Sequence, residues 1–111
     1  MLCVPVASAS GKADTRVTLD NIEAFPASTI WTGDIFSSKK VCKNKRQVLV
    51  YLDIDGPDEK RGSTKSYKGM VQPGYFWAYE EEGGAPAGYY YAKVRATADC
   101  KADRSPIYIY D

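Results

Sequence analysis

The stretch from Gln47 to Ile54, which reads QVLVYLDI, carries the clearest structural signal in the chain. Four of its apolar side chains fall on one face of an extended strand, namely Val48, Val50, Leu52 and Ile54. Leu49 and Tyr51 fall on the opposite face, because successive side chains of a strand point to opposite sides. Aliphatic and aromatic residues at this period of two are typical of a β-strand. We therefore expect a strand that lies against a hydrophobic core.

Six further stretches have strand composition, whereas no window longer than ten residues keeps the apolar spacing of a helix. The expected strands are residues 16–19, 29–36, 62–67, 75–79, 89–97 and 105–110. Within 89–97, alternation assigns to the interior Tyr90, Ala92, Val94 and Ala96. Gly and Pro mark turns between strands, as in segments 55–58 and 83–88. Because a parallel sheet needs crossover helices, the chain is expected to form an all-β, antiparallel, seven-stranded sandwich.

Composition excludes several classes of function. Fifteen Lys and Arg residues oppose fourteen Asp and Glu residues in 111 residues, which argues against a partner bound through net charge, such as a nucleic acid. The lack of histidine excludes Ser-His-Asp and Cys-His nucleophile pairs and zinc sites that use imidazole. No apolar run reaches the ~20 residues of a membrane-spanning helix. We expect no cofactor, no nucleic-acid partner and no membrane insertion.

The N-terminus resembles the end of a secretory signal peptide. A short apolar stretch precedes Ala7-Ser8-Ala9, which fits an A-x-A cleavage site. We expect residues 1–12 to be a residual signal peptide or a disordered leader, and residues 13–111 to form a single β-sandwich domain.

Three cysteines are an odd number, so at least one has no partner within the chain. If Cys3 belongs to a cleaved leader, Cys42 and Cys100 remain as a pair. We expect these two to form a disulfide, which places the protein in an oxidising, extracellular compartment. The alternatives are free thiols in a cytosolic protein and a metal site, although two thiolates without histidine supply few ligands.

Several short motifs resemble a module of secreted actinobacterial proteins. They are Gly33-x-Ile35-x-Ser37, Cys42-x3-Arg46-x-Val48-x-Val50, Gly62-Ser63, Gly88-x-Tyr90-Tyr91-Ala92-x-Val94 and Cys100-x4-Ser105. In this order they are similar to the immunoglobulin-like or prealbumin-like sandwiches that accompany carboxypeptidases and surface adhesins. The resemblance spans residues 14–111 and implies seven strands without catalytic residues. The acidic segment 80–82 departs from the pattern.

Aromatic side chains are the main candidates for ligand binding, since exposed rings stack on sugars and anchor protein interfaces. Alternation gathers them on one face of each of three strands, with Phe76 on the opposite face of its strand. The candidate binding residues are Tyr75, Trp77, Tyr79, Tyr89, Tyr91, Tyr108 and Tyr110. If the three strands lie in one sheet, these rings form a single patch. The alternative is that the rings fill the core and cap its rim.

Charged clusters offer further candidates. The acidic residues Asp53, Asp55 and Asp58 have the oxygen ligands that Ca²⁺ takes, but their spacing does not match an EF-hand loop, so a solvated turn is expected instead of a metal site. Five cations within residues 39–46 suit an anionic polymer, yet the near-zero net charge favours a role in keeping a strand edge from pairing. Carboxylates at 53–55 and 80–82 would suit glycoside hydrolysis only if the small sandwich had a cleft.

These observations predict a secreted, non-catalytic module that binds a carbohydrate or an extracellular protein through an aromatic-rich face. Two alternatives stay open. One is a structural or assembly domain of an extracellular protein. The other is a small secreted inhibitor that uses a rigid loop such as residues 80–88. The oligomeric state has no signal in the sequence.

Overall fold

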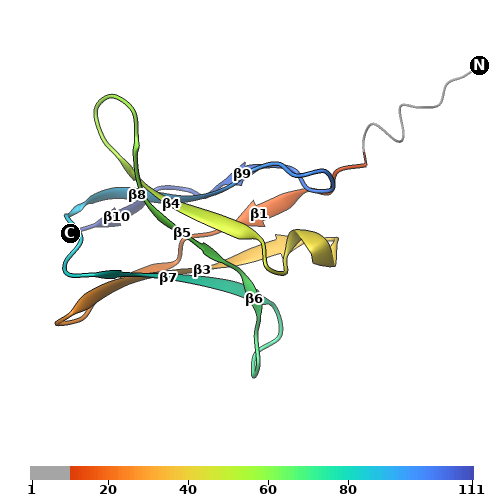
Figure 1. The fold of residues 1–111 in the computed structure, drawn as a ribbon, viewed down its shortest axis with the longest axis horizontal. Helices are drawn as coiled ribbons and strands as arrows, with labels where there is room; N and C mark the ends of the chain where they lie inside the picture. The colour runs from red at the N-terminus through yellow and green to blue at the C-terminus, as the bar shows by residue number, and fades with distance from the viewer. Residues whose placement is uncertain (1–10) are drawn as a thin grey trace, which may run out of the picture.

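The computed structural model describes residues 11–111, which form two antiparallel β-sheets arranged as a sandwich (Figure 1). The longer strands are β3 (Ser28–Ser37), β4 (Gln47–Asp53), β5 (Glu59–Lys65), β7 (Tyr75–Glu82) and β8 (Gly88–Val94). The shorter strands are β1 (Thr15–Val17), β2 (Asn21–Ala24), β6 (Tyr67–Lys68), β9 (Asp103–Arg104) and β10 (Tyr108–Tyr110). A single turn of 3₁₀ helix, η1 (Lys40–Cys42), precedes β4. Cys3 and the proposed cleavage site lie outside the described residues.

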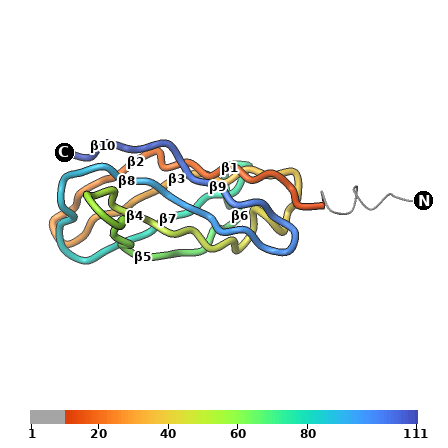
Figure 2. Tube along the Cα trace, turned by 90° about the horizontal axis from the view of Figure 1, so that it is seen from above, coloured from red at the N-terminus to blue at the C-terminus, as the bar shows by residue number. Residues whose placement is uncertain are grey.

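The first sheet has the strand order β1-β3-β7-β6, and β2 pairs with β3 beside β1. The second sheet has the order β10-β8-β4-β5, and β9 pairs with β8. Seen from above, the strands run along the long axis of the molecule (Figure 2). Every pairing between these strands is antiparallel, so the predicted all-β antiparallel sandwich is confirmed.

The expected number of seven strands is wrong, because residues 11–111 form ten. The three additional strands are β2, β6 and β9, each two to four residues long. β6 and β9 have two residues each, which is too short for an alternating pattern to be recognised in the sequence. β2 has four residues, but only Ile22 is buried, so it has no alternating pattern either. Two predicted strands are also shorter than expected, since β8 ends at Val94 and β10 begins at Tyr108.

The hydrophobic core lies between the sheets and is made by the inner faces of the long strands. Alternation correctly predicted six of its residues on β4 and β8, which are Val48, Val50, Leu52, Tyr90, Ala92 and Val94. Ile54 and Ala96 are exposed, contrary to expectation, because each lies beyond the end of its strand. Trp31 and Trp77 are fully buried and fill the first sheet's side of the core.

The predicted disulfide is present and ties together one end of the sandwich. Cys42 at the end of η1 is joined to Cys100, at a sequence separation of 58 and with 5.5 Å between their Cα atoms. Cys100 also forms a β-bridge with Ala13, just before β1. The disulfide and the bridge together therefore connect three distant chain segments.

Side chains close both long sides of the sandwich. On one side the Asp103 carboxylate of β9 accepts a hydrogen bond from the Val17 backbone N–H of β1 at 2.8 Å. On the other side Arg61 of β5 forms an ion pair with Glu81 of β7. These links join the edges of the two sheets. The outer faces of the two sheets are therefore the two broad surfaces of the molecule.

Candidate functional site

The seven aromatic residues predicted to form a patch do not share one surface. Three of them belong to β7 in the first sheet, namely Tyr75, Trp77 and Tyr79. The other four belong to β8 and β10 in the second sheet, namely Tyr89, Tyr91, Tyr108 and Tyr110. The premise that these three strands lie in one sheet is therefore wrong, because the chain changes sheets between β7 and β8.

Most of these rings point into the sandwich. Trp77 is fully buried, and its indole Nε1–H donates to the backbone oxygen of Thr18 at 2.9 Å. Four further rings are half-buried against the core, which are Tyr75, Tyr79, Tyr108 and Tyr110. This arrangement corresponds to the alternative in which the rings fill the core and cap its rim.

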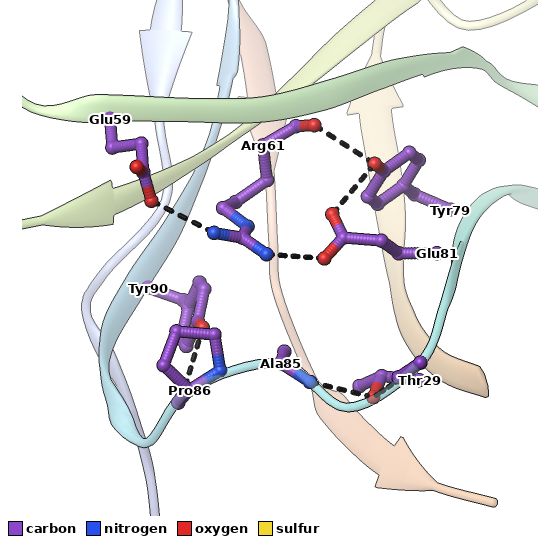
Figure 3. Close-up of polar contacts among 9 residues, drawn as sticks. Thr29, Glu59, Arg61, Tyr79, Glu81, Ala85, Pro86 and Tyr90 are labelled. Atoms are coloured by element: carbon purple, nitrogen blue, oxygen red, sulfur yellow. Dashed lines mark hydrogen bonds and ion pairs between the residues drawn. The ribbon is translucent and has the colours of Figure 1, made fainter. Parts of the chain in front are cut away.

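Tyr79 belongs to a polar network that joins the two sheets (Figure 3). Its hydroxyl lies 2.9 Å from the backbone oxygen of Arg61 and 3.0 Å from Oε2 of Glu81. The Arg61 guanidinium pairs with Glu81 and, at 2.8 Å, with Glu59. The hydrogen bond to Glu81 raises the pKa of Arg61, and burial raises the pKa of Tyr79. Glu81 is therefore engaged in holding β7 to β5.

Tyr89 and Tyr91 lie on the outer face of the second sheet, but only Tyr89 is exposed, at 52%. The ring of Tyr91 stacks on Tyr51 with 5.3 Å between ring centroids, and the Arg104 guanidinium lies 3.7 Å from the Tyr91 centroid. The Tyr91 hydroxyl donates to the Asp58 carboxylate. Burial and this hydrogen bond raise the pKa of Tyr91 to about 12. Tyr91 is thus a covered residue that anchors the β4–β5 turn.

The acidic residues of the β4–β5 turn do not assemble into a cation site. Asp58 accepts the hydrogen bond from Tyr91, which lowers the pKa of Asp58, and Asp55 is exposed to solvent. Among residues 11–111, no group of three or more His, Cys, Asp or Glu side chains is placed to hold a metal ion, so Asp53, Asp55 and Asp58 do not form one.

The outer face of the first sheet carries an exposed aromatic surface that the sequence reasoning missed. Tyr67 of β6 is 49% exposed and lies opposite Phe76 of β7, with 6.4 Å between ring centroids. Phe36 of β3 is 43% exposed. It lies two residues beyond Asp34, the register partner of Phe76, and so occupies a diagonal position on the same face.

The turn from β6 to β7 extends this surface. Met70 and Val71 are 98% and 96% exposed and line a shallow hollow of about 480 Å³ together with Tyr67 and Phe76. We call the five residues the apolar outer surface: Phe36, Tyr67, Met70, Val71 and Phe76.

The hairpin backbone fixes the position of the Phe76 ring. A Cβ atom added at Gly69 would lie 2.6 Å from Cε2 of Phe76 and 2.3 Å from the backbone oxygen of Gln72. The Gly69 N–H donates to the Gly74 carbonyl at 2.9 Å across the base of the turn. Glycine therefore lets the turn close directly against the ring of Phe76.

A cation borders the same surface at its other end. The Arg16 guanidinium of β1 lies 4.5 Å from the centroid of Phe36, within the range of a cation–π interaction. Arg16 and Phe36 also line a second shallow hollow, of about 400 Å³. The only sequence signal for this surface was the alternation that set Phe76 opposite the other rings of β7.

The described residues contain no helix long and apolar enough to cross a membrane. No protein-family model matches the chain, and no curated protein and no solved structure matches it.

Proposed function

We propose that the chain is a non-catalytic binding module that recognises an extracellular protein through the apolar outer surface. The observation that carries the proposal is the nearly complete exposure of Met70 and Val71 next to the rings of Tyr67 and Phe76. Contiguous exposed apolar surface marks sites of interaction, and Phe, Tyr, Met and Arg are the residue types enriched in protein interfaces.

A protein partner suits this surface better than a sugar. Met70 and Val71 add aliphatic area without hydrogen-bonding side chains, whereas a small-ligand site orients its ligand with precisely placed polar groups. The Arg16–Phe36 pair adds an arginine and an aromatic ring to this surface. Arginine and aromatic residues are common in the hot spots of protein interfaces.

The proposal includes an extracellular location and no catalysis. The Cys42–Cys100 disulfide supports the location, because such bonds persist in oxidising compartments. The chain has no histidine that could act as a general base. Glu59 and Glu81 are both paired with Arg61, so these two carboxylates serve the structure. Both points support a role in binding and not in catalysis. A relationship to immunoglobulin-like or prealbumin-like sandwiches belongs to the same proposal and is supported by the two antiparallel sheets.

Site-specific photo-crosslinking in the native host tests the function. A photoreactive amino acid in place of Met70 is expected to capture a defined protein, identified by mass spectrometry. The same amino acid in place of Lys60, an exposed residue of β5, serves as the matched control. Equal capture at both positions, or capture of a glycan alone at position 70, would contradict a protein-binding surface.

The captured protein then allows a quantitative test. The double variant Met70→Ser, Val71→Ser is expected to weaken its binding at least tenfold without lowering the unfolding temperature, because both side chains are exposed. Ile109→Ser is the control, since Ile109 is 65% exposed on β10 of the other sheet. An equal loss of binding in the control would show that general hydrophobicity, and not this surface, drives binding.

A further inference from the structure

The charges of the chain are segregated to opposite ends of the sandwich, which the net charge of +1 conceals. Strand register brings four segments to the end that holds the disulfide: 11–14, 38–46, 65–74 and 95–102. These segments contain ten Lys or Arg residues and two carboxylates. We call this the basic end.

The opposite end has the reverse composition. Segments 23–28, 53–59, 80–88 and 110–111 meet there and contain nine Asp or Glu residues without a single Lys or Arg. The near-zero net charge therefore arises from cancellation between two distant ends. It does not argue against an anion site within the lysine-rich segment 39–46.

The basic end contains a cavity of about 360 Å³ between the loop before β4 and the loop after β8. Most of its lining side chains are hydrogen-bond donors, which are Asn44, Lys45, Arg46, Gln47, Arg95 and Thr97. Asp99 is the one carboxylate in the lining. The cavity is therefore lined mainly by residues with donor groups and lies within a surrounding excess of positive charge, which favours an anion.

Arg46 is a buried cation in this lining, at 5% exposure. Its guanidinium donates to four neutral oxygens: Thr15 Oγ1 at 3.1 Å and the backbone oxygens of Cys42, Arg95 and Lys101 at 3.0, 2.8 and 2.9 Å. No ion pair in residues 11–111 includes Arg46. A buried charge without a counter-ion is unfavourable, and burial accordingly lowers the pKa of Arg46. An anion in the cavity would supply the missing negative charge.

Lys45, beside Arg46, has an unusual backbone conformation. Its φ of 52° is the only positive value at a non-glycine residue among residues 11–111. Its N–H donates to the Ser66 carbonyl at 3.0 Å, which helps to hold the conformation in place. Lysine is ill suited to the left-handed region, where Asn or Gly is preferred, and such positions concentrate at functional sites. The side chain of Lys45 lines the cavity and is exposed to solvent.

We propose that this cavity is an anion-binding site for the sulfate or phosphate groups of an acidic glycan. The exposed donors Lys45 and Arg95 bind the anionic group, and the buried charge of Arg46 favours it electrostatically. Asn44, Gln47 and Thr97 supply groups that suit sugar hydroxyls. The lining contains no aromatic ring, so it lacks the stacking platform that single-stranded nucleic acids use. The other lysines of the basic end suit a ligand with repeated negative charges.

The test is titration of the full chain with two labelled glycans, a heparin oligosaccharide for sulfate and a phosphorylated mannan oligosaccharide for phosphate. At least one of them is expected to bind, more weakly as salt is added. Lys45→Asn and Arg95→Gln are each expected to weaken binding about tenfold. Asparagine accepts the left-handed conformation, so the first variant removes the charge without disturbing the turn. Lys60→Gln, at an exposed position next to the acidic end, is the matched control and is expected to bind like the wild type.

Several results would overturn the site. These are binding of neither glycan, an equal effect of all three substitutions, and tighter binding of nucleic acid than of either glycan. A fourth result that would overturn the site is self-association, measured by sedimentation at low salt. If the basic end instead binds the acidic end of a second copy, the chain associates with itself, and Lys45→Asn disrupts that association.

Discussion

At the residue scale, Gly33 of β3 shows how closely two segments approach. A Cβ atom on Gly33 would lie 1.9 Å from the backbone oxygen of Thr18 and 2.7 Å from Nε1 of Trp77. Those two atoms are themselves hydrogen-bonded at 2.9 Å. The link between β1 and β2 therefore crosses directly over Gly33, and no larger residue leaves room for it.

We predict that Gly33→Ala lowers the free energy of unfolding by about 3 kcal/mol or more, because a backbone oxygen and a buried indole have to move. Urea denaturation measures the change. Gly84→Ala is the control, since a Cβ there meets no atom within 4 Å, and its effect is expected to stay below about 0.5 kcal/mol. Similar losses in the two variants would contradict the close approach.

Tyr91 predicts a dependence of stability on alkaline pH. Its pKa is about 12 in the folded chain against an ordinary value of 10.0, so the folded state holds the proton more tightly. The resulting stabilisation is complete below pH 10 and is lost as the pH rises through about 12. Tyr91→Phe is expected to flatten this fall, measured by denaturant titration at a series of pH values, whereas Tyr89→Phe keeps it. An unchanged fall in Tyr91→Phe would contradict the assignment.

At the scale of single elements, alternation predicted the strands whose two faces differ in chemistry. β4 has its three core residues on a single face, as predicted, although Leu49 on the other face is fully buried as well. β7 is different, because Phe76 lies on one face and Tyr75, Trp77 and Tyr79 on the other, so both faces carry rings. Sequence alone groups those rings correctly but does not say which group is inside. That choice depends on the sheet packed against β7, so the apolar outer surface was missed.

The link between β5 and β7 predicts unequal effects for two neighbouring glutamates. Glu81 pairs with Arg61 and contacts the Tyr79 hydroxyl, whereas Glu80 is exposed. Glu81→Gln is expected to lower the free energy of unfolding by about 1–2 kcal/mol, because it removes the negative charge that pairs with Arg61 and one of the two acceptor oxygens that link the sheets. Glu80→Gln is expected to change it by less than about 0.5 kcal/mol. Chemical denaturation compares them, and equal values would argue against the link.

At the scale of the whole molecule, the distribution of charge on which the proposed anion site rests depends on topology. A sum over charges carries no positional information, so the sequence suggested a balanced surface where the fold builds a basic end and an acidic end. The disulfide pair was predicted correctly because its two signals, the parity of the cysteines and the signal-like sequence around Cys3, need no fold. The contact between Ala13 and Cys100 had no counterpart in the sequence, because it joins residues 87 positions apart without a periodic signal.

The Cys42–Cys100 disulfide is the feature on which the proposed extracellular role depends, because it fastens the basic end and such bonds persist in oxidising compartments. The most direct measurement is thiol alkylation of the protein recovered from its native host, before and after reduction, followed by mass spectrometry of the two cysteine peptides. We predict no label on Cys42 or Cys100 before reduction and label on both afterwards. Label on either cysteine before reduction would contradict the bond and the proposal of an extracellular module that rests on it.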